Sequence, residues 1–292
     1  MAEEEAPAGE VSGLGDGRMM AAALFAGLWA AGVPAVQDPP PPAPQERPLS
    51  EEQVLQRLAN PLAALASFSL TADFDYHIGP LEEGHRTTMS VQPQVPLSLG
   101  EEWNIVSRTI LPVIYQEETF PGAGNQFGVG DLTEAVYLVA AQPSRRGWIG
   151  GVGPIFRLPV GSDDLLSSKK WALGPSLALI RQQDDFTFGV IASQLWSFAG
   201  SDRRPDISVL TFDPFATWRM VGLWNLTLHL PSSYDFRADQ WTIPAALTVE
   251  KLVSFQKAPV TISFGIRWWA DGPDSGPHDL GFRFGLTLVF PK

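Results

Sequence analysis

Apolar and polar residues alternate along most of the chain from Ala66 onward. The large apolar residues of the last segment all share one parity: Leu280, Phe282, Phe284, Leu286, Leu288 and Phe290. Glycine, arginine and threonine occupy the other parity, and the segment 260–268 repeats the same arrangement. Because successive side chains of a strand point to opposite faces, this period of two predicts strands with one apolar and one polar face.

Earlier segments at 91–99, 171–179 and 224–230 show the alternation less cleanly. Between 187 and 198 the assignment is ambiguous, since Phe188 and Trp196 share their parity with Gln194. No helical period extends beyond two turns after Ala66. Together with the turn signals, the segments indicate about twelve strands between 67 and 290.

The predicted connections alternate in length. Short ones lie near 100–102, 144–146, 183–185, 220–222 and 256–258, and longer ones lie at 78–84, 117–125, 162–168, 200–206, 232–239 and 271–279. Short periplasmic turns, longer outer loops and an even strand number are typical of outer-membrane barrels, whose closure leaves no free sheet edge. We therefore predict an all-β fold, a transmembrane antiparallel up-and-down β-barrel of about twelve strands over residues 61–292.

Aromatic residues near both ends of the predicted strands favour two interfacial girdles. The first set follows the short turns: Trp103, Trp148, Phe186 and Trp224. The second set lies beside the long loops: Tyr115, Trp171, Phe198, Tyr234, Trp241 and Trp269.

The segment before the predicted barrel has a different character. Residues 1–17 are acidic, and Arg18 then precedes a short apolar run that closes in Val33-Pro34-Ala35, which is the pattern of a secretory signal peptide. We expect 1–35 to be an acidic extension plus signal peptide, with translation from Met19 or Met20 explaining the extension. A buried helix hairpin is the alternative.

Residues 36–60 are expected to form a proline-rich linker followed by a short helix. The four prolines at 39–42 favour an extended spacer. Ser50 and Gln53 have the spacing of a capping box, which predicts a short N-terminal helix from Ser50 to about Asn60.

Composition removes several classes of function. The 292 residues contain no cysteine, which excludes disulfides, thiolate metal sites and a thiol nucleophile. The net charge of −12 has no basic block within it, so nucleic acid is not an expected partner. A mean hydropathy of +0.01 fits a barrel whose strands have one wet face.

Several stretches carry a family resemblance. These are 58–65 (LANPLAAL), 107–116 (SRTILPVIYQ), 151–154 (GVGP), 171–175 (WALGP), 268–271 (WWAD) with 276–277 (GP), and 290–292 (FPK). On them, residues 57–292 resemble the outer-membrane transporter-like barrels related to the MetA-pathway of phenol degradation. The resemblance implies a transporter in a Gram-negative outer membrane, sometimes linked to uptake of aromatic compounds. It carries over no catalytic pattern.

If the large apolar residues face lipid, the charged residues of opposite parity face the lumen. The candidate lumen-lining residues are Arg108, Arg157, Asp213, His229, Glu250, Arg267 and Arg283. Charged groups around a narrow lumen set ion preference, and a mixture of both signs orients dipolar solutes. The alternative is that these groups pair only to fill and rigidify the barrel.

We expect a passive channel for small solutes, aromatic or hydrophobic compounds among them, that is not an enzyme. The alternatives are an outer-membrane lipid hydrolase that uses His229 with Ser232 or Ser233, and a non-conducting structural barrel. We predict no catalytic residue, cofactor or metal site. The expected location is the outer membrane of a Gram-negative bacterium. The expected partners are membrane lipids, lipopolysaccharide, a small-molecule solute and the barrel-assembly machinery.

Overall fold

The computed structural model of the protein describes residues 49–256 and 258–290. The expected acidic extension, signal peptide and proline-rich spacer lie outside these residues. One helix, α2 (Glu51–Leu58), precedes the strand segments. The segments are β1 (Ala66–Ile78), β2 (Gly84–Leu99), β3 (Trp103–Glu117), β4 (Asn125–Val129), β5 (Leu132–Ala140), β6 (Trp148–Leu158), β7 (Lys170–Gln183), β8 (Phe186–Gly200), β9 (Ser208–Met220), β10 (Trp224–His229), β11 (Ser232–Asp235), β12 (Gln240–Phe255), β13 (Ala258–Asp271) and β14 (Leu280–Phe290).

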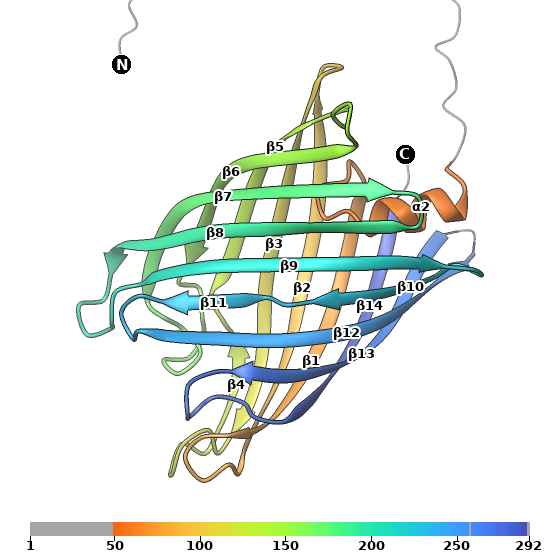
Figure 1. Ribbon diagram of the computed structural model, residues 1–292. Helices are drawn as coiled ribbons and strands as arrows, with labels where there is room; N and C mark the ends of the chain where they lie inside the picture. Colours follow the sequence, from red (N-terminus) through yellow and green to blue (C-terminus); the bar gives the residue numbers. More distant parts are fainter. Residues whose placement is uncertain (1–48, 257, 291–292) are drawn as a thin grey trace, which may run out of the picture. The chain divides into compact units, whose positions relative to one another are not determined.

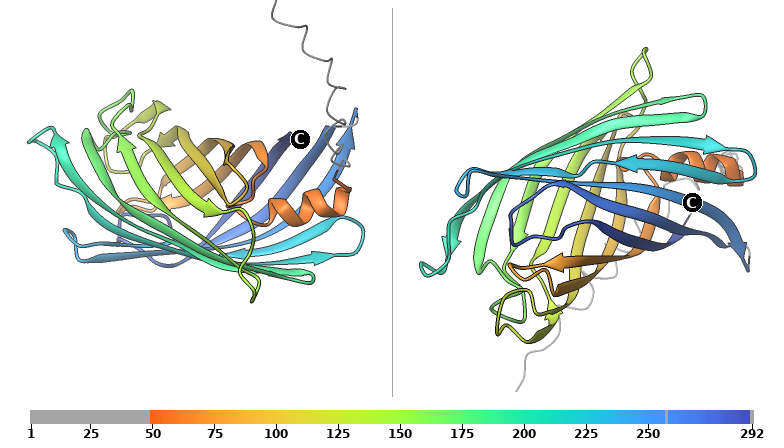
Figure 2. Two further views of the ribbon diagram at one scale, coloured as in Figure 1. Left: turned by 90° about the horizontal axis from the view of Figure 1, so that it is seen from above. Right: turned by 60° about the horizontal axis from the view of Figure 1, so that its bottom comes forward.

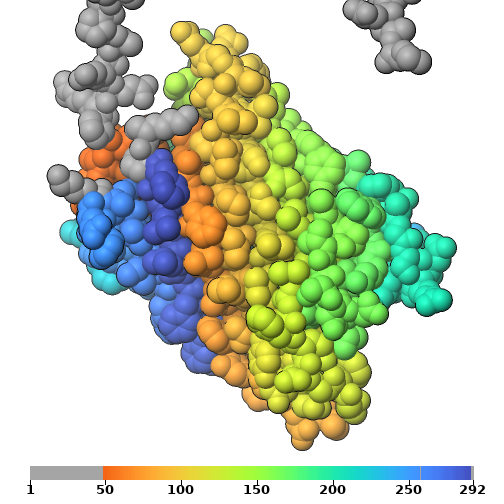
Figure 3. All heavy atoms as spheres, turned by 180° about the vertical axis from the view of Figure 1, so that it is seen from behind, coloured from red at the N-terminus to blue at the C-terminus, as the bar shows by residue number. Residues whose placement is uncertain are grey.

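The segments form a closed antiparallel barrel (Figure 1). Segments β4 and β5 both pair with β3 and lie end to end, as β10 and β11 do between β9 and β12. The fourteen described segments are therefore twelve strands, two of them interrupted. Strand β14 pairs with β1 from Phe74↔Phe282 to Ala66↔Phe290, and Figure 3 shows these two ends of the sheet side by side. The predicted barrel is confirmed.

The connections alternate in length as expected. The turns at 100–102, 184–185 and 221–223 lie at the end of the barrel where β1 begins and β14 ends, and the longer loops 118–124, 159–169 and 272–279 lie at the other end. The expected long loop at 232–239 is wrong, because β11 occupies its first half and pairs with both neighbours. Pro231 has no N–H to donate and marks the break between β10 and β11.

The outer wall is apolar. On β7, Trp171, Leu173, Leu177 and Leu179 are 41–52% exposed, whereas the intervening Ala178 is buried. The same alternation around the barrel provides the lipid-facing band of an outer-membrane protein. Within the described part of the chain, no helix is long and apolar enough to cross a membrane.

Two side-chain directions depart from the simple pattern. On β8, Phe188 and Trp196 face outward, while the large apolar residue Leu195 is buried on the inner side. The expectation that Trp269 belongs to an aromatic girdle is wrong. Its ring packs 5.3 Å from the guanidinium carbon of Arg267, and its Nε1 is buried.

One side of the barrel interior is filled by apolar side chains. They are Val106, Ala135, Tyr137, Val139, Ala178, Ile180 and Phe215, from β3, β5, β7 and β9. Tyr137 satisfies its hydroxyl within this cluster through Ser176, at 2.7 Å. The open part of the interior therefore lies on the side formed by β9, β10, β12–β14 and β1–β3.

Candidate lumen site

The site begins with helix α2, which forms where the capping box predicts it. The Ser50 hydroxyl accepts a hydrogen bond from the Gln53 N–H at 3.3 Å, and the Gln53 side chain accepts one from the Ser50 N–H at 2.9 Å. These contacts satisfy two N–H groups that the first turn would leave unpaired. The helix ends at Leu58, shortly before Pro61.

The helix packs inside the short-turn end of the barrel. Val54 and Leu55 are buried against Leu252 of β12 and Val289 of β14, and Leu65 joins this cluster from the chain that follows the helix. Figures 1 and 2 show α2 at this end of the barrel. Because short turns of outer-membrane barrels are periplasmic, the helix occupies the periplasmic mouth.

Hydrogen bonds from three strands hold residues 49–65, which we term the plug segment. Gln94 of β2 and Gln182 of β7 donate to its backbone carbonyl oxygens at 3.2 and 2.8 Å. Ser254 of β12 donates to the carboxylate of Glu51. Each of these strands is four positions from the next around the twelve-strand barrel. The plug segment therefore reaches across the mouth from one wall to the others.

Leu62 anchors the far end of the plug segment. Its side chain is 2% exposed and belongs to the apolar cluster that fills one side of the interior. Gly151 of β6 makes room for it, since a Cβ at this position would lie 2.6 Å from Leu62 Cδ1. A glycine on the inner wall thus matches a leucine on the plug.

A cavity of about 330 Å³ lies inside the barrel beside the plug segment. Ser67, Ser90, Gln92 and Thr227 contribute polar groups to its wall, and Ile191 contributes an apolar one. Seven ionisable side chains line it: Arg57, Asp73, Arg108, Asp213, His229, Glu250 and Arg283. Its volume is at the lower end of the ~300–1,000 Å³ common for small-molecule sites.

Ion pairs between β1, β13 and β14 lie at the end of this cavity that faces the long loops. Arg283 donates from two nitrogens to Asp73 at 2.6 and 2.8 Å. Arg267 donates to both oxygens of Asp75 at 2.7 and 2.9 Å, and lies 3.4 Å from Asp73. Arg267 and Asp75 are each 6% exposed. This cluster joins the two strands that close the barrel.

His229 faces Asp213 rather than a serine. Its Nδ1 lies 3.3 Å from Asp213 Oδ1, and its ring stacks on Phe215 with centroids 5.5 Å apart. The Ser232 hydroxyl donates to the carbonyl oxygen of Leu230 at 3.1 Å. In the described residues, no hydrogen bond joins His229 to Ser232 or Ser233, the pair considered for a hydrolase.

Glu250 has only neutral partners. It accepts hydrogen bonds from Asn225 Nδ2 at 3.3 Å and from the Thr261 hydroxyl at 3.0 Å. Asn225 is 2% exposed, and its Oδ1 is buried without a hydrogen-bond donor. Neither Glu250 nor Arg108 has an ion-pair partner among residues 49–256 and 258–290. Most buried polar groups are satisfied, so the Oδ1 atom of Asn225 is an exception, and Glu250 and Arg108 differ from the paired charges of the wall.

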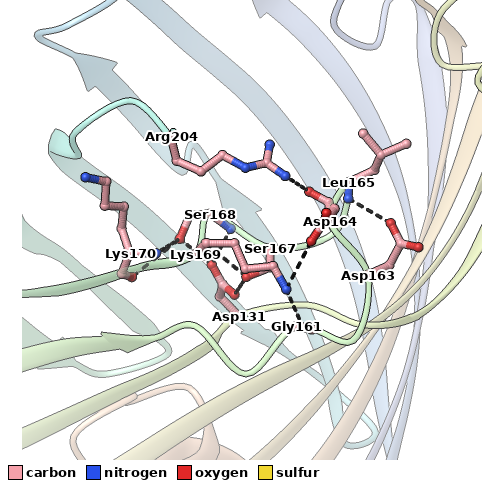
Figure 4. A network of polar contacts seen from close by, with 10 residues as sticks. All are labelled: Asp131, Gly161, Asp163, Asp164, Leu165, Ser167, Ser168, Lys169, Lys170 and Arg204. Atoms are coloured by element: carbon pink, nitrogen blue, oxygen red, sulfur yellow. Dashed lines mark hydrogen bonds and ion pairs between the residues drawn. The ribbon is translucent and has the colours of Figure 1, made fainter. Parts of the chain in front are cut away.

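Arg157 lies apart from this cavity. It lines a second one of about 470 Å³ with Asp131, under the loop 159–169. Ser167 and Ser168 bind the Asp131 carboxylate through a hydroxyl at 2.7 Å and an N–H at 2.8 Å, and Arg204 reaches the same loop (Figure 4). This network fixes the loop against the break between β4 and β5.

The structure thus gathers five of the seven predicted residues around one cavity: Arg108, Asp213, His229, Glu250 and Arg283. Arg157 belongs to the second cavity, and Arg267 to a buried ion pair. The sequence reasoning missed Asp73 and Asp75. Their signal was present in 66–78, where Ser67, Ser69, Thr71, Asp73 and Asp75 alternate with the apolar residues Phe68, Leu70, Ala72 and Phe74.

Comparisons with known proteins agree with this architecture. No protein-family model and no curated protein matches the sequence. Among solved structures, the chain is similar to an outer membrane channel from Pseudomonas putida F1, with a TM-score of 0.61 and 13% identity over 78% of this chain and 96% of that one. It also matches the NanC porin (TM-score 0.48, 12% identity, 76% and 98% covered) and outer membrane phospholipase A from Escherichia coli (0.47, 12%, 82% and 96%).

At these identities the likeness concerns the fold, and the first of the three structures carries it. The protein is an outer-membrane β-barrel, and its place is the outer membrane of a Gram-negative bacterium.

Proposed function

We propose that this barrel is a channel that passes small solutes across the outer membrane without an energy source. The observation that carries the proposal is the polar cavity inside the closed wall, lined by charges of both signs. A barrel that serves only as a structural element gains more from a packed interior than from unpaired charges such as Arg108 and Glu250. The fold is shared with a protein described as an outer membrane channel, and the proposal carries that role over to this chain.

The plug segment controls access to the channel in this proposal. It lies across the periplasmic mouth, and its buried leucines hold it there. Solute transfer therefore requires this segment to move or to leave a narrow path beside the cavity. The wall strands pair with one another without it, so the ring of strands stays intact when the plug segment is displaced and the channel opens.

The solute class includes amphipathic and aromatic compounds in this proposal. The resemblance to barrels related to the MetA-pathway of phenol degradation implies aromatic compounds, and the cavity offers Ile191 and Phe215 beside its charged groups. Chemistry at the barrel is not part of the proposal, since among the described residues no hydrogen bond joins His229 to Ser232 or Ser233, and the Ser232 hydroxyl donates to the carbonyl oxygen of Leu230. The proposed partners are lipids, lipopolysaccharide at the outer loops and the assembly machinery during insertion.

Ion selectivity in planar bilayers tests the proposal. Folded, purified protein should give discrete conductance steps, and Arg108→Ala should shift the reversal potential toward cation preference because it removes a positive charge from the lumen wall. Arg181→Ala is the matched control, since Arg181 lies over the Trp148 ring near the short-turn end rather than in the cavity lining. No conductance from inserted protein, whether the plug segment is docked or loosened, would contradict the channel.

A further inference from the structure

Two unpaired charges of opposite sign remain on the cavity wall once the ion pairs are set aside. Arg108 projects from β3 and Glu250 from β12, and both line the same cavity. A third unpaired charge, Arg57, belongs to the plug segment and is exposed. The strand walls therefore present one fixed cation and one fixed anion to whatever occupies the cavity.

These two groups lie on opposite walls. Strands β12 and β3 are separated by β13, β14, β1 and β2, so they are five positions apart in a barrel of twelve strands. The two charges form no ion pair with each other, unlike Arg283 and Asp73 on adjacent strands. A dipolar solute that spans the cavity satisfies both.

Glu250 has no cationic partner among the described residues. Its partners, Asn225 and Thr261, are neutral, and the Oδ1 atom of Asn225 is buried without a donor. An ammonium group has three N–H donors and no acceptor. It can therefore bond to the carboxylate of Glu250, which its two neutral partners leave without a counter-charge. On the opposite wall, the Arg108 guanidinium suits a carboxylate, which it can bind through two parallel hydrogen bonds.

We infer that the cavity binds small zwitterions whose ammonium and carboxylate groups lie at opposite ends of the molecule. The ammonium binds at Glu250, the carboxylate binds at Arg108, and the cavity wall offers Ile191 and Phe215 to the carbon chain between them. A simple anion leaves Glu250 unpaired, and a simple cation leaves Arg108 unpaired. This inference rests on the proposed function, because it names the solute class that the channel selects.

Binding to the full-length chain, purified in detergent, tests the inference with three probes of equal length. Equilibrium dialysis should show that 6-aminohexanoate binds about tenfold or more tightly than hexanoate or hexylammonium, because only it makes both charge-assisted contacts. Glu250→Gln and Arg108→Gln should each remove this preference. The double variant Glu250→Arg with Arg108→Glu should restore it, with the zwitterion reversed. Binding that persists in the double variant Glu250→Gln, Arg108→Gln, which removes both charges, is subtracted as non-specific.

Equal affinity for the three probes overturns the inference. So does an unchanged preference in both single variants, or a preference lost in Arg57→Gln and kept in Arg108→Gln, since the anion site would then lie on the plug segment. Flux of a neutral sugar through proteoliposomes separates this from the proposed function. Flux without zwitterion preference leaves the channel standing and removes the inference. Zwitterion binding without any flux contradicts the channel and leaves the zwitterion site standing.

Discussion

Leu55 holds the plug segment in the periplasmic mouth, so truncating its side chain should release the segment and open the channel. Its side chain is 0% exposed and packs in the cluster that contains Leu252 and Val289. A fully buried leucine changed to alanine costs ~2–5 kcal/mol in protein cores. Because the wall strands pair without the helix, this cost falls on the docked state of the plug segment and not on the barrel.

At about 1.4 kcal/mol for each factor of ten, the docked-to-undocked ratio should fall by about 30-fold to about 4,000-fold. We expect Leu55→Ala to raise the open probability of single channels in planar bilayers, and to speed tryptic cleavage after Arg57. Leu97→Ala is the matched control, since Leu97 is 56% exposed on the lipid-facing side. An open probability and a cleavage rate equal to those of the wild type, in folded Leu55→Ala, would refute the reasoning.

Two further substitutions test the interior from other directions. Gly151→Val should displace Leu62 and reproduce the Leu55→Ala phenotype, because even a Cβ at this glycine would lie 2.6 Å from Leu62 Cδ1; unchanged single-channel gating would count against it. Arg267→Gln should lower the free energy of unfolding in guanidinium by about 3–5 kcal/mol, because it leaves the buried Asp75 carboxylate without its ion pair. The double variant Arg267→Gln, Asp75→Asn should lose less unfolding free energy than Arg267→Gln alone, because no unpaired carboxylate remains. An equal loss in both variants would show that the unpaired Asp75 does not cause the destabilisation.

The barrel was predictable because its wall obeys one local rule. Strand alternation depends only on neighbouring residues, so 280–290 and 260–268 indicate their two faces without tertiary information. The rule fails where the lumen itself is apolar. Leu195 is a large apolar residue buried on the inner side, and no local pattern distinguishes such a residue from one that faces lipid.

The partners of the inward charges were not predictable in the same way. The sequence indicates that Arg108 and Arg267 share an inner face, yet the first lines a cavity and the second is buried in an ion pair with Asp75, 192 positions away along the chain. The helix at 51–58 was predicted from its cap, whereas its place in the mouth depends on Leu62 meeting Gly151. Such contacts depend on strand register around the whole barrel.

The most direct test of the channel is the flux of a neutral sugar into proteoliposomes that contain folded protein. The account predicts flux above that of protein-free liposomes, faster in Leu55→Ala, and slower again in Leu55→Ala combined with Ser90→Trp, which narrows the cavity. Met89→Trp, on the exposed outer face, should leave the Leu55→Ala rate unchanged. Absence of flux in folded, inserted Leu55→Ala would contradict the account, because it would show that small neutral solutes do not cross the barrel even when the plug segment is loosened.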